Sequence, residues 1–476
     1  MITFKTTKEI KSRENIFCYK NIIINWGQKI KHKKRRKRMK KGLALLLTAA
    51  LTISMAACGT KEPANTDNNV QESENTADNK TENNGDKTVI RFINGFTGGD
   101  GAFMTKIVDG FNESQDKYFV EQLQDADHYT KFKSDNTYDM LIIHADWIST
   151  YHELGLLREV SDIYDAAGIS FENDFHDITK TYAKYDDGIY AFPLDLYAET
   201  FFYNKELVGD DVPENYQDLI ALRDKLDSEN TNIYPLSIPL TGDHQWGWMT
   251  ALGQSGVNWV EDGHVKIDTQ EACDAFMKIH DLIYVDKLSA AGLGANAHTD
   301  SFIAEASDGA NVRAAMVMTG PWNYTSFKEI LGDNLAIGTL PQIYGDTKCV
   351  PAGGHTFGVS ANVTDEDKLA GIAKFFKYVY QPEVLLNWAD SGQAPVHLAT
   401  MELVKADPEK YPVAAVNYTI FDDCMILPAV YNIREQVKYV NETVWAMVVQ
   451  TENLSPDDLM VELEKATKIA EELSVK

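Results

Sequence analysis

The sequence is poor in cysteine and has no cysteine pair at the spacing of a redox or zinc site. Five cysteines occur among 476 residues, namely Cys18, Cys58, Cys273, Cys349 and Cys424. None belongs to a CxxC motif, and the three that follow residue 58 are widely separated. This odd number argues against a disulfide scaffold. We predict three buried, inert thiols, with one disulfide and a spare thiol as the alternative.

Positive charge is scarce in most of the chain. Of 45 basic and 71 acidic residues, residues 1–57 hold 15 basic and only 2 acidic ones, so the remainder carries a net formal charge of −39. Such a body repels phosphate backbones and anionic membrane surfaces, which argues against nucleic-acid binding. The basic run HKKRRKR at 32–38 is interpreted as an over-long signal n-region or, as we favour, as sequence upstream of a true start at Met39.

Catalytic motifs are also missing. His152 and Glu153 are followed by Leu-Gly-Leu and form no HExxH motif, the Gly253–Gly256 segment lacks the GxSxG spacing, and Gly99–Gly101 lacks the third glycine of a dinucleotide loop. The abundant carboxylates single out no glycosidase pair. We predict a protein that is not an enzyme and that has no cofactor or metal.

One long apolar run is present, in the segment MKKGLALLLTAALTISMAAC at 39–58. A cationic start, an apolar middle and small residues before Cys58 are typical of a secretory signal. The uncharged part, 42–57, is short for a membrane span, which needs about 20 apolar residues and is the alternative. The segment resembles a bacterial lipobox. That resemblance implies a lipid on Cys58 and a protein anchored to the outer face of the cytoplasmic membrane.

The chain after Cys58 divides into a tether and a body. Residues 59–87 are rich in Asn, Asp, Glu and Thr, so we predict a disordered tether of roughly 30 Å. The body, 88–476, is long enough for two lobes. Strand and helix patterns alternate along it, which predicts α/β lobes with mostly parallel sheets. We predict strands at 88–94, 138–144, 189–192, 199–204, 313–318 and 356–359, and helices at 102–112, 146–153, 216–227, 269–286, 320–331, 365–390 and 432–450. A last helix opens at Ser455, which suits an N-cap.

Four tryptophans lie at or near the predicted strand-to-helix turns: Trp147, Trp246, Trp248 and Trp322. Ligands gather at such turns, beyond the carboxyl ends of parallel strands. An indole face suits the C–H face of a sugar ring, and neighbouring polar side chains such as Asp146 and Asp243 can bond its hydroxyls. The alternative is that each tryptophan is a core or rim residue, and Trp248 in particular could belong to the core.

Several ordered segments resemble the extracellular solute-binding lipoproteins of carbohydrate ABC importers, the family that includes maltose-binding protein. The segments are IRFINGFTGGDG at 90–101, YDMLIIHAD at 138–146, GIYAFPLDLYAETFFYNKEL at 188–207, AMVMTGPW at 315–322, GGHTF at 353–357 and SGQAP at 391–395. Together they extend over some 300 residues in the order of the family.

This resemblance implies an α/β, two-lobed fold of the type II periplasmic-binding-protein kind, with the ligand cleft between the lobes. It implies lobe 1 at 88–195 plus 342–392 and lobe 2 at 198–339 plus 395–476, linked near 195–198, 340–341 and 392–395. Closure about these links would bury the ligand, and the closed form would dock on a membrane permease. The chain is expected to act as a monomer.

The resemblance also implies the ligand-binding residues. Asp146 stands at the position of a carboxylate that bonds sugar hydroxyls, and Trp322 at that of a stacking platform. The other implied residues are Asp100, Trp147, Tyr197, Asp243, Trp246, Trp248, Gly354 and His355.

The sequence is also compatible with three other functions. The same fold could bind a cation such as a polyamine, because acidic residues, including Asp195 and Glu199, lie near the expected cleft. A surface glycosidase would release products from oligosaccharides. An adhesin or scaffold would bind no solute.

Overall fold

The computed structural model describes residues 87–229, 232–241, 243–294, 297–304 and 312–475. The described residues all belong to one compact unit. The predicted signal segment, the Met39 start, the lipidation site Cys58 and the tether up to residue 86 lie outside the described residues. Among the residues described, no helix is both long and apolar enough to span a bilayer.

Lobe 1 is built on a five-stranded sheet in the order β2-β1-β3-β16-β6. β1 pairs in parallel with β2 and β3, whereas β16 runs antiparallel to β3 and β6. β1 is the predicted TVIRFIN strand, and its Ile90 and Phe92 are fully buried. The bounds are β1 (Thr88–Asn94), β2 (Tyr118–Gln124), β3 (Met140–His144), β6 (Phe192–Pro193) and β16 (His355–Val359).

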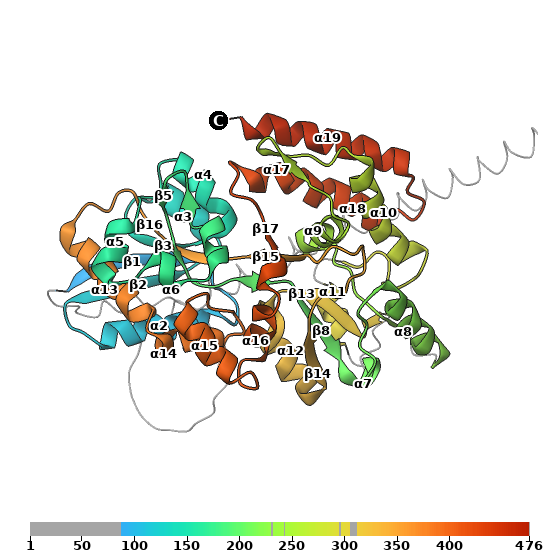
Figure 1. Cartoon of the computed structure of the whole chain (residues 1–476), viewed down its shortest axis with the longest axis horizontal. Helices are drawn as coiled ribbons and strands as arrows, with labels where there is room; N and C mark the ends of the chain where they lie inside the picture. Colours follow the sequence, from blue (N-terminus) through green and yellow to red (C-terminus); the bar gives the residue numbers. More distant parts are fainter. Residues whose placement is uncertain (1–86, 230–231, 242, 295–296, 305–311, 476) are drawn as a thin grey trace, which may run out of the picture. The chain divides into compact units, whose positions relative to one another are not determined.

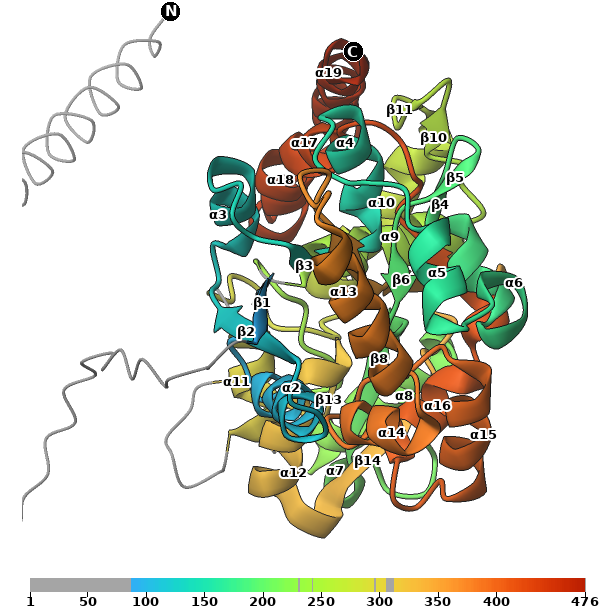
Figure 2. The ribbon, with the colours of Figure 1, turned by 90° about the vertical axis from the view of Figure 1, so that its left-hand side faces the viewer.

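Helices cover the lobe 1 sheet with apolar faces. In α2 the residues Met104, Ile107, Val108 and Phe111 are buried at helical spacing, and Phe111 meets Phe375 of α13 edge to face at 5.2 Å. Figure 2 looks onto this lobe, where α2 and α14 lie side by side. The elements are α2 (Gly101–Glu113), α3 (His128–Ser134), α4 (Ile148–Glu153), α5 (Ser161–Ala167), α6 (Phe171–Asp174), α13 (Glu366–Val379) and α14 (Pro382–Ala389), with the hairpin β4 (Lys184–Tyr185) and β5 (Gly188–Ile189).

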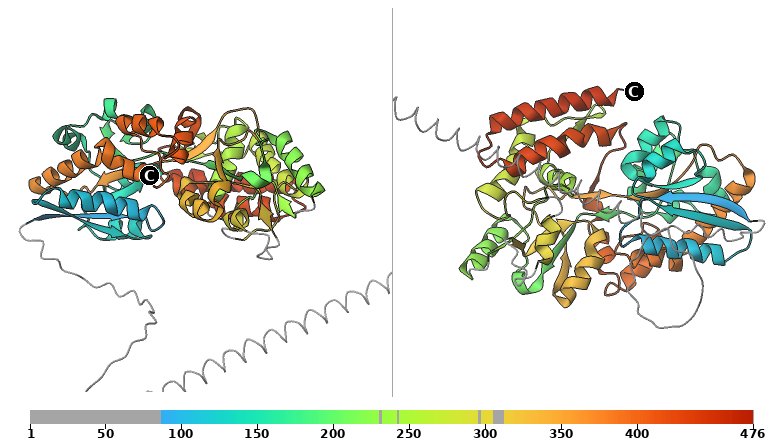
Figure 3. Two further views of the ribbon diagram at one scale, coloured as in Figure 1. Left: turned by 90° about the horizontal axis from the view of Figure 1, so that it is seen from below. Right: turned by 180° about the vertical axis from the view of Figure 1, so that it is seen from behind.

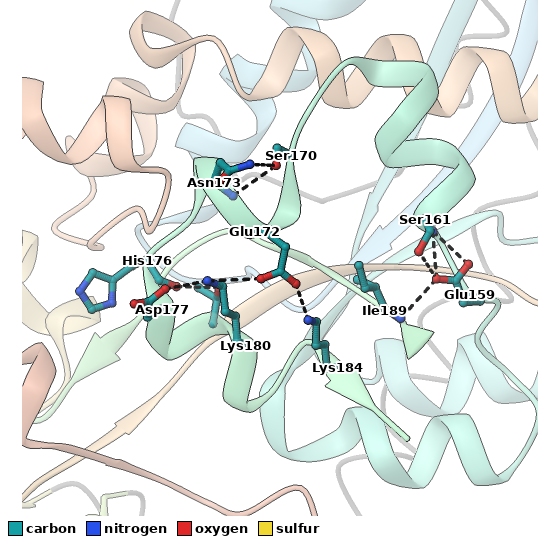
Figure 4. A network of polar contacts seen from close by, with 11 residues as sticks. Glu159, Ser161, Ser170, Glu172, Asn173, His176, Asp177, Lys180, Lys184 and Ile189 are labelled. Carbon is teal, nitrogen blue, oxygen red and sulfur yellow. Dashed lines mark hydrogen bonds and ion pairs between the residues drawn. The ribbon is translucent and has the colours of Figure 1, made fainter. Parts of the chain in front are cut away.

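Polar contacts secure the segment that leads from lobe 1 toward lobe 2 (Figure 4). Glu172 of α6 forms ion pairs with Lys180, at 3.4 Å, and with Lys184. Glu159 accepts a hydrogen bond from the backbone of Ile189, at 3.3 Å. Because most of these charges are solvent-exposed, each pair contributes little to stability, and the network chiefly sets the path of the chain.

Lobe 2 contains the antiparallel sheet β13-β8-β14, a parallel pair β9-β12 and a small hairpin β10-β11. The prediction of mostly parallel sheets is therefore wrong. In lobe 2, β8 lies between two strands that run against it, and in lobe 1 the chain returns from lobe 2 as β16, which runs against β3. The strands are β8 (Thr200–Asn204), β9 (Ile233–Tyr234), β10 (Val260–Glu261), β11 (His264–Val265), β12 (Arg313–Ala314), β13 (Met316–Thr319) and β14 (Leu335–Gly338).

The helices of lobe 2 include the last three α-helices of the chain, α17, α18 and α19. α17 and α19 lie side by side (Figure 3). The helices are α7 (Lys205–Val208), α8 (Tyr216–Ser228), α9 (His244–Gln254), α10 (Gln270–Tyr284), α11 (Ala297–Ile303), α12 (Tyr324–Leu331), α17 (Ile433–Tyr439), α18 (Trp445–Gln450) and α19 (Pro456–Ser474). α15 (Leu398–Ala406) and α16 (Pro412–Tyr418) follow α14 in the chain; α15 packs on α14, and α16 packs on β14 of lobe 2.

Two C-terminal predictions are confirmed in detail. The helical run at 432–450 is present as α17 and α18, joined by the π-helix Val440–Val444. Ser455 caps α19, since its hydroxyl accepts a hydrogen bond from the backbone of Asp458 at 3.1 Å.

Three short strands form a sheet between the lobes (Figure 1). β15 (Val350–Gly353) pairs antiparallel with β7 (Tyr197–Ala198) and parallel with β17 (Cys424–Ile426). An isolated bridge joins Asp195 to Pro395 beside them. The first and third predicted links therefore meet at one place in the fold, as hinge strands that share hydrogen bonds would.

The segment that follows the predicted second link at 340–341 packs on α9. Ile343 and Tyr344 donate backbone hydrogen bonds to the side chain of Gln254 in α9, at 2.9 and 3.0 Å. Thr347 donates to the Gln254 carbonyl oxygen at 3.2 Å. Residues 343–347 are therefore held against α9 before the chain enters β15.

The three cysteines in the described part of the chain are free thiols. Cys273 and Cys349 are buried, and burial raises the pKa of Cys349 to about 12. Burial also raises the pKa of Cys273 and of the half-buried Cys424, so the three thiols stay protonated at physiological pH; the predicted burial holds for Cys273 and Cys349 and only in part for Cys424.

Candidate functional site: the cleft between the lobes

A cavity of about 510 Å³ opens between the lobes. Lobe 1 contributes the segments that follow β1 and β3, which are parallel strands ending at the same edge of the sheet. Lobe 2 contributes the start of α9, the turn before α12 and one face of α17. The lining includes Phe96, Asp100, His128, His144, Asp146, Tyr197, Gln245, Trp246, Trp322, Gly353, His355, Arg434 and Asn441.

Three aromatic rings meet in this cavity. The ring centroids of Tyr197 and Trp322 are 5.8 Å apart, those of Tyr197 and Trp246 are 5.9 Å apart, and those of the two tryptophans are 6.0 Å apart. The rings are tilted by 52 to 74° to one another, so they present faces in several directions. We call these three residues the aromatic platform. Apolar ring faces next to polar side chains form a surface suited to a molecule with both C–H and hydroxyl groups.

An ion pair links the two lobes at the wall of the cavity. Asp146, directly after β3, contacts Arg434 of α17 with Nε–Oδ2 and Nη2–Oδ1 distances of 2.6 and 3.1 Å. The Asp146 side chain is 8% exposed and that of Arg434 is 36% exposed. The carboxylate is thus largely shielded from water while the guanidinium keeps part of its contact with solvent, and each charge compensates the other.

Two further hydrogen bonds join the same parts of the lobes. Ser149 donates to the carbonyl oxygen of Val430 at 3.0 Å, and the Thr150 hydroxyl accepts from the backbone of Asn432 at 3.0 Å. Together with the ion pair they form an interlobe seam between the segment 146–150 and the segment 430–434.

Histidines line the lobe 1 side of the cavity in a fixed arrangement. Asp195 accepts hydrogen bonds from the His355 backbone at 2.9 Å and from the Trp388 indole at 2.6 Å, and its carboxylate lies 2.9 Å from Nδ1 of His355. The Tyr129 hydroxyl accepts from the backbone of His144 at 2.8 Å and also forms a hydrogen bond with Nδ1 of the His144 ring. His144 and His355 have ring centroids 4.9 Å apart. The imidazoles are therefore held by buried partners rather than free to rotate.

The electrostatics of the cavity are nearly balanced. Burial lowers the pKa of His144 well below its usual value and lowers that of His128 as well, which keeps both imidazoles neutral. Burial raises the pKa of Asp100. In the described lining the carboxylates are Asp100 and Asp146, and Arg434 compensates the second. The strongly acidic body therefore surrounds a cleft of low net charge.

Six of the predicted site residues line the cavity: Asp100, Asp146, Tyr197, Trp246, Trp322 and His355. Trp147 lies behind it and packs on Tyr129 at 5.1 Å, with the Arg434 guanidinium 5.9 Å from its own ring centroid. Trp147 therefore packs against the ion pair of Asp146 and Arg434 and does not line the cavity.

Three other predicted site residues lie elsewhere. Trp248 is fully buried in the core of lobe 2 and donates its indole N–H to Asn441 at 2.7 Å, so the alternative given for this residue is the correct one. Asp243 is bonded inside lobe 2, to Thr319 and to His298 at 3.1 Å. Gly354 faces the Asp195 carbonyl and Tyr182, and the glycine that lines the cavity is its neighbour Gly353.

Sequence reasoning did not find Phe96, His128, His144, Arg434 and Asn441, whereas Gln245 lines the cavity as a polar neighbour of Trp246. Arg434 and Asn441 are seven residues apart on α17 and the π-helix that follows, and this spacing places them on one helical face. Nothing in the local sequence distinguishes that face from an ordinary solvated one. Away from the cavity, the described residues contain one set of possible metal ligands, namely His152, Glu153 and Asp186.

The chain belongs to the family of bacterial extracellular solute-binding proteins, whose model matches residues 106–412. Among curated proteins, it is similar to the arabinooligosaccharide-binding protein of Halalkalibacterium halodurans, with 26% identity over 196 residues. That match covers 40% of this chain, and the chain spans 43% of that relative.

Solved structures with the same fold include maltose-bound MalE3 of T. maritima, with a TM-score of 0.65 and 19% identity over 80% of this chain and 99% of that one. The GacH receptor of Streptomyces glaucescens has a TM-score of 0.67 and 20% identity over 81% of this chain and 99% of that one. These matches confirm the predicted two-lobed α/β fold of type II, and the family model confirms that the chain is a solute-binding protein.

Proposed function

We propose that the protein captures a neutral oligosaccharide, of the arabino-oligosaccharide class, in the interlobe cleft and delivers it to the permease of an ABC importer. The observation that carries this proposal is the aromatic platform of Tyr197, Trp246 and Trp322 beside hydrogen-bonding side chains. Ring faces cover the C–H faces of pyranoses or furanoses, while Asp146, Arg434 and Asn441 bond their hydroxyls. The name of the Halalkalibacterium relative supports the choice of sugar.

The charge of the cleft favours a neutral ligand over a cation. A polyamine site would need several uncompensated carboxylates facing the ligand, but Asp146 is already paired with Arg434. Asp195 is taken up by His355 and Trp388, and Glu199 is buried behind the hinge strands. The acidic residues that suggested a cation are thus engaged within the protein.

Closure of the cleft provides the mechanism. The interlobe sheet β7-β15-β17 carries the hinge, and both lobes contribute groups to the ligand. A ligand that contacts both walls binds the closed form more tightly than the open form and thereby shifts the population toward closure. The permease would then recognise the closed arrangement of the two lobes. No step requires catalysis, and long incubation should leave the oligosaccharide intact.

Thermal unfolding with a panel of sugars tests the proposal. We expect arabino-oligosaccharides at about 100 times their Kd to stabilise the protein by about 2.7 kcal/mol and to raise Tm accordingly. The shift should be nearly unchanged between low and high salt, because the ligand is neutral. Malto-oligosaccharides and spermidine serve as controls. Stabilisation by spermidine alone, weakened steeply by salt, would contradict the proposal.

We further propose that Cys58 carries a lipid that holds the protein at the outer face of the cytoplasmic membrane, near its permease. The signal-like segment before Cys58 supports this. Mass spectrometry of the protein expressed in a bacterium that processes lipoproteins should find a mature N-terminus at Cys58, with the added mass of a diacylglycerol. The Cys58→Ser variant should lack this mass and leave the membrane fraction. A peptide from residues 1–38 in the unprocessed precursor would refute the Met39 start.

A further inference from the structure

Two rings of the aromatic platform lie directly on glycines. A Cβ atom built on Gly320 would stand 2.0 Å from Cη2 and Cζ3 of Trp322, and one built on Gly353 would stand 2.4 Å from Oη and 2.5 Å from Cζ of Tyr197. Real Cβ atoms essentially never come within 3.0 Å of another heavy atom. Each ring therefore occupies the space that the Cβ of any other residue would need.

The backbone does not explain these glycines. Gly320 has φ −84° and ψ 164°, an extended conformation open to every residue, and neither it nor Gly353 belongs to the glycines with positive φ. In the turn that follows, Trp322 stands two residues after Gly320, and its ring folds back onto that glycine. Gly353 of β15 is the pairing partner of Tyr197 in the antiparallel strand β7. The Tyr197 ring therefore lies across β15 at the position of this glycine.

We propose that Gly320 and Gly353 are positioning residues, which set the location of the Trp322 and Tyr197 rings and through them the ligand selectivity of the cleft. This inference rests on the proposed function of the site. Because the two rings contact each other and Trp246, a displacement of one moves the surface formed by all three. Neither glycine needs to touch the ligand for this effect.

The kind of atom that an added Cβ would meet distinguishes a glycine that positions a ring from a glycine that the fold requires. The atoms that a new methyl group would meet are the outer atoms of side chains that border the cavity, and these can move into it. Gly345 is the opposite case, because a Cβ there would stand 2.2 Å from the backbone oxygen of Gln254. We therefore expect alanine at 320 or 353 to alter the cleft and spare the fold, and alanine at 345 to destabilise the fold.

The test compares the variants Gly320→Ala and Gly353→Ala with Gly294→Ala, a control glycine whose Cβ would meet nothing within 4 Å. Near-ultraviolet circular dichroism and tryptophan fluorescence of the ligand-free proteins report the ring positions. Calorimetric titration with arabino- and malto-oligosaccharides reports affinity. For both platform variants we expect changed spectra, cooperative unfolding, and an affinity reduced about tenfold or more with an altered ratio between sugars. Gly294→Ala should match the wild type in every measurement.

A double-mutant comparison isolates the ring from the methyl group. In the Trp322→Ala background the Gly320→Ala change should have no further effect on affinity, because no ring remains to be displaced. Equal additional losses in both backgrounds would overturn the proposal, as would wild-type spectra and affinities in the two glycine variants. Failure of either variant to fold would also overturn it, since the glycine would then serve the fold. If the wild type binds no sugar, the proposed function fails, and the ligand-free spectra still decide the ring placement.

Discussion

Replacement of Glu199 by glutamine is expected to raise the free energy of unfolding by up to about 4 kcal/mol at pH 7.5. Glu199 stands between β7 and β8, is 2% exposed, and accepts a hydrogen bond from Thr250 at 2.6 Å. Burial raises its pKa from 4.5 to about 8, and this bond only partly opposes the shift. At pH 7.5 the folded protein therefore holds a proton that the unfolded chain has released.

The sign of the pH dependence follows from this raised pKa. Below pH 4.5 the carboxyl group is protonated in both states and costs nothing. Between pH 4.5 and about 8 the unfolded state is ionised while the folded state is not, so folding loses about 1.4 kcal/mol per pH unit. Above about pH 8 both states are ionised and the loss stays constant.

Urea denaturation of the wild type and of Glu199→Gln from pH 4 to 9 measures this effect. The difference between the two proteins should be small at pH 4, grow with pH, and level off above pH 8. Glu472→Gln, at an exposed position of α19, is the matched control and should follow the wild type throughout. A constant difference across the range would show that Glu199 does not titrate as its burial requires.

Replacement of Arg434 by methionine is expected to weaken oligosaccharide binding about 100-fold, or by about 3 kcal/mol. Methionine keeps much of the volume but removes the cation, so the 8% exposed Asp146 carboxylate is left without its partner. Removing one member of a shielded pair costs more than the pair contributes, because the remaining charge stays desolvated. The same change cuts the interlobe seam, and closure becomes less favourable.

Calorimetric titration of Arg434→Met with the sugar that stabilises the wild type gives the affinity. Lys438→Met, on the same helix, is the control, because Lys438 is 57% exposed and forms only a long ion pair, at 3.8 Å, with Glu435. It should bind within a factor of about two of the wild type. The double variant with Asp146→Asn should recover part of the loss, since no unpaired charge remains. Wild-type affinity in Arg434→Met would show that the ion pair does not contribute to ligand binding.

The predictions that held depend on local patterns. TVIRFIN became β1 because alternating and buried apolar residues specify a strand, and Ser455-Pro-Asp-Asp began α19 because capping involves only neighbouring residues. Trp322 reached the cavity because it lies in the turn between the predicted strand 313–318 and the predicted helix 320–331, whereas Trp246 lies in the first turn of α9, which the pattern did not predict. The predicted family rested on ordered motifs, and a family model covering residues 106–412 confirmed it.

The parts that were missed depend on contacts between distant residues. Asp146 and Arg434 are 288 residues apart in the chain, and only the packing of α17 beside the end of β3 brings them together. Trp248 could not be told from a ligand platform by its neighbours, because its burial depends on Trp259 and Asn441. The direction of β16, and hence the mixed sheet of lobe 1, follows from the return of the chain across the hinge.

The sequence by itself thus determined the family, the α/β alternation and most of the aromatic residues that face the cleft, since these follow from motifs, periodicity and turns within short windows. Only the tertiary structure decided which polar groups face the cleft, how their charges are compensated, and that Gly320 and Gly353 carry the rings of the platform. Those properties arise from the three-dimensional approach of segments that are remote in sequence, and side-chain burial, which sets both electrostatics and ring position, exists only after the lobes have packed.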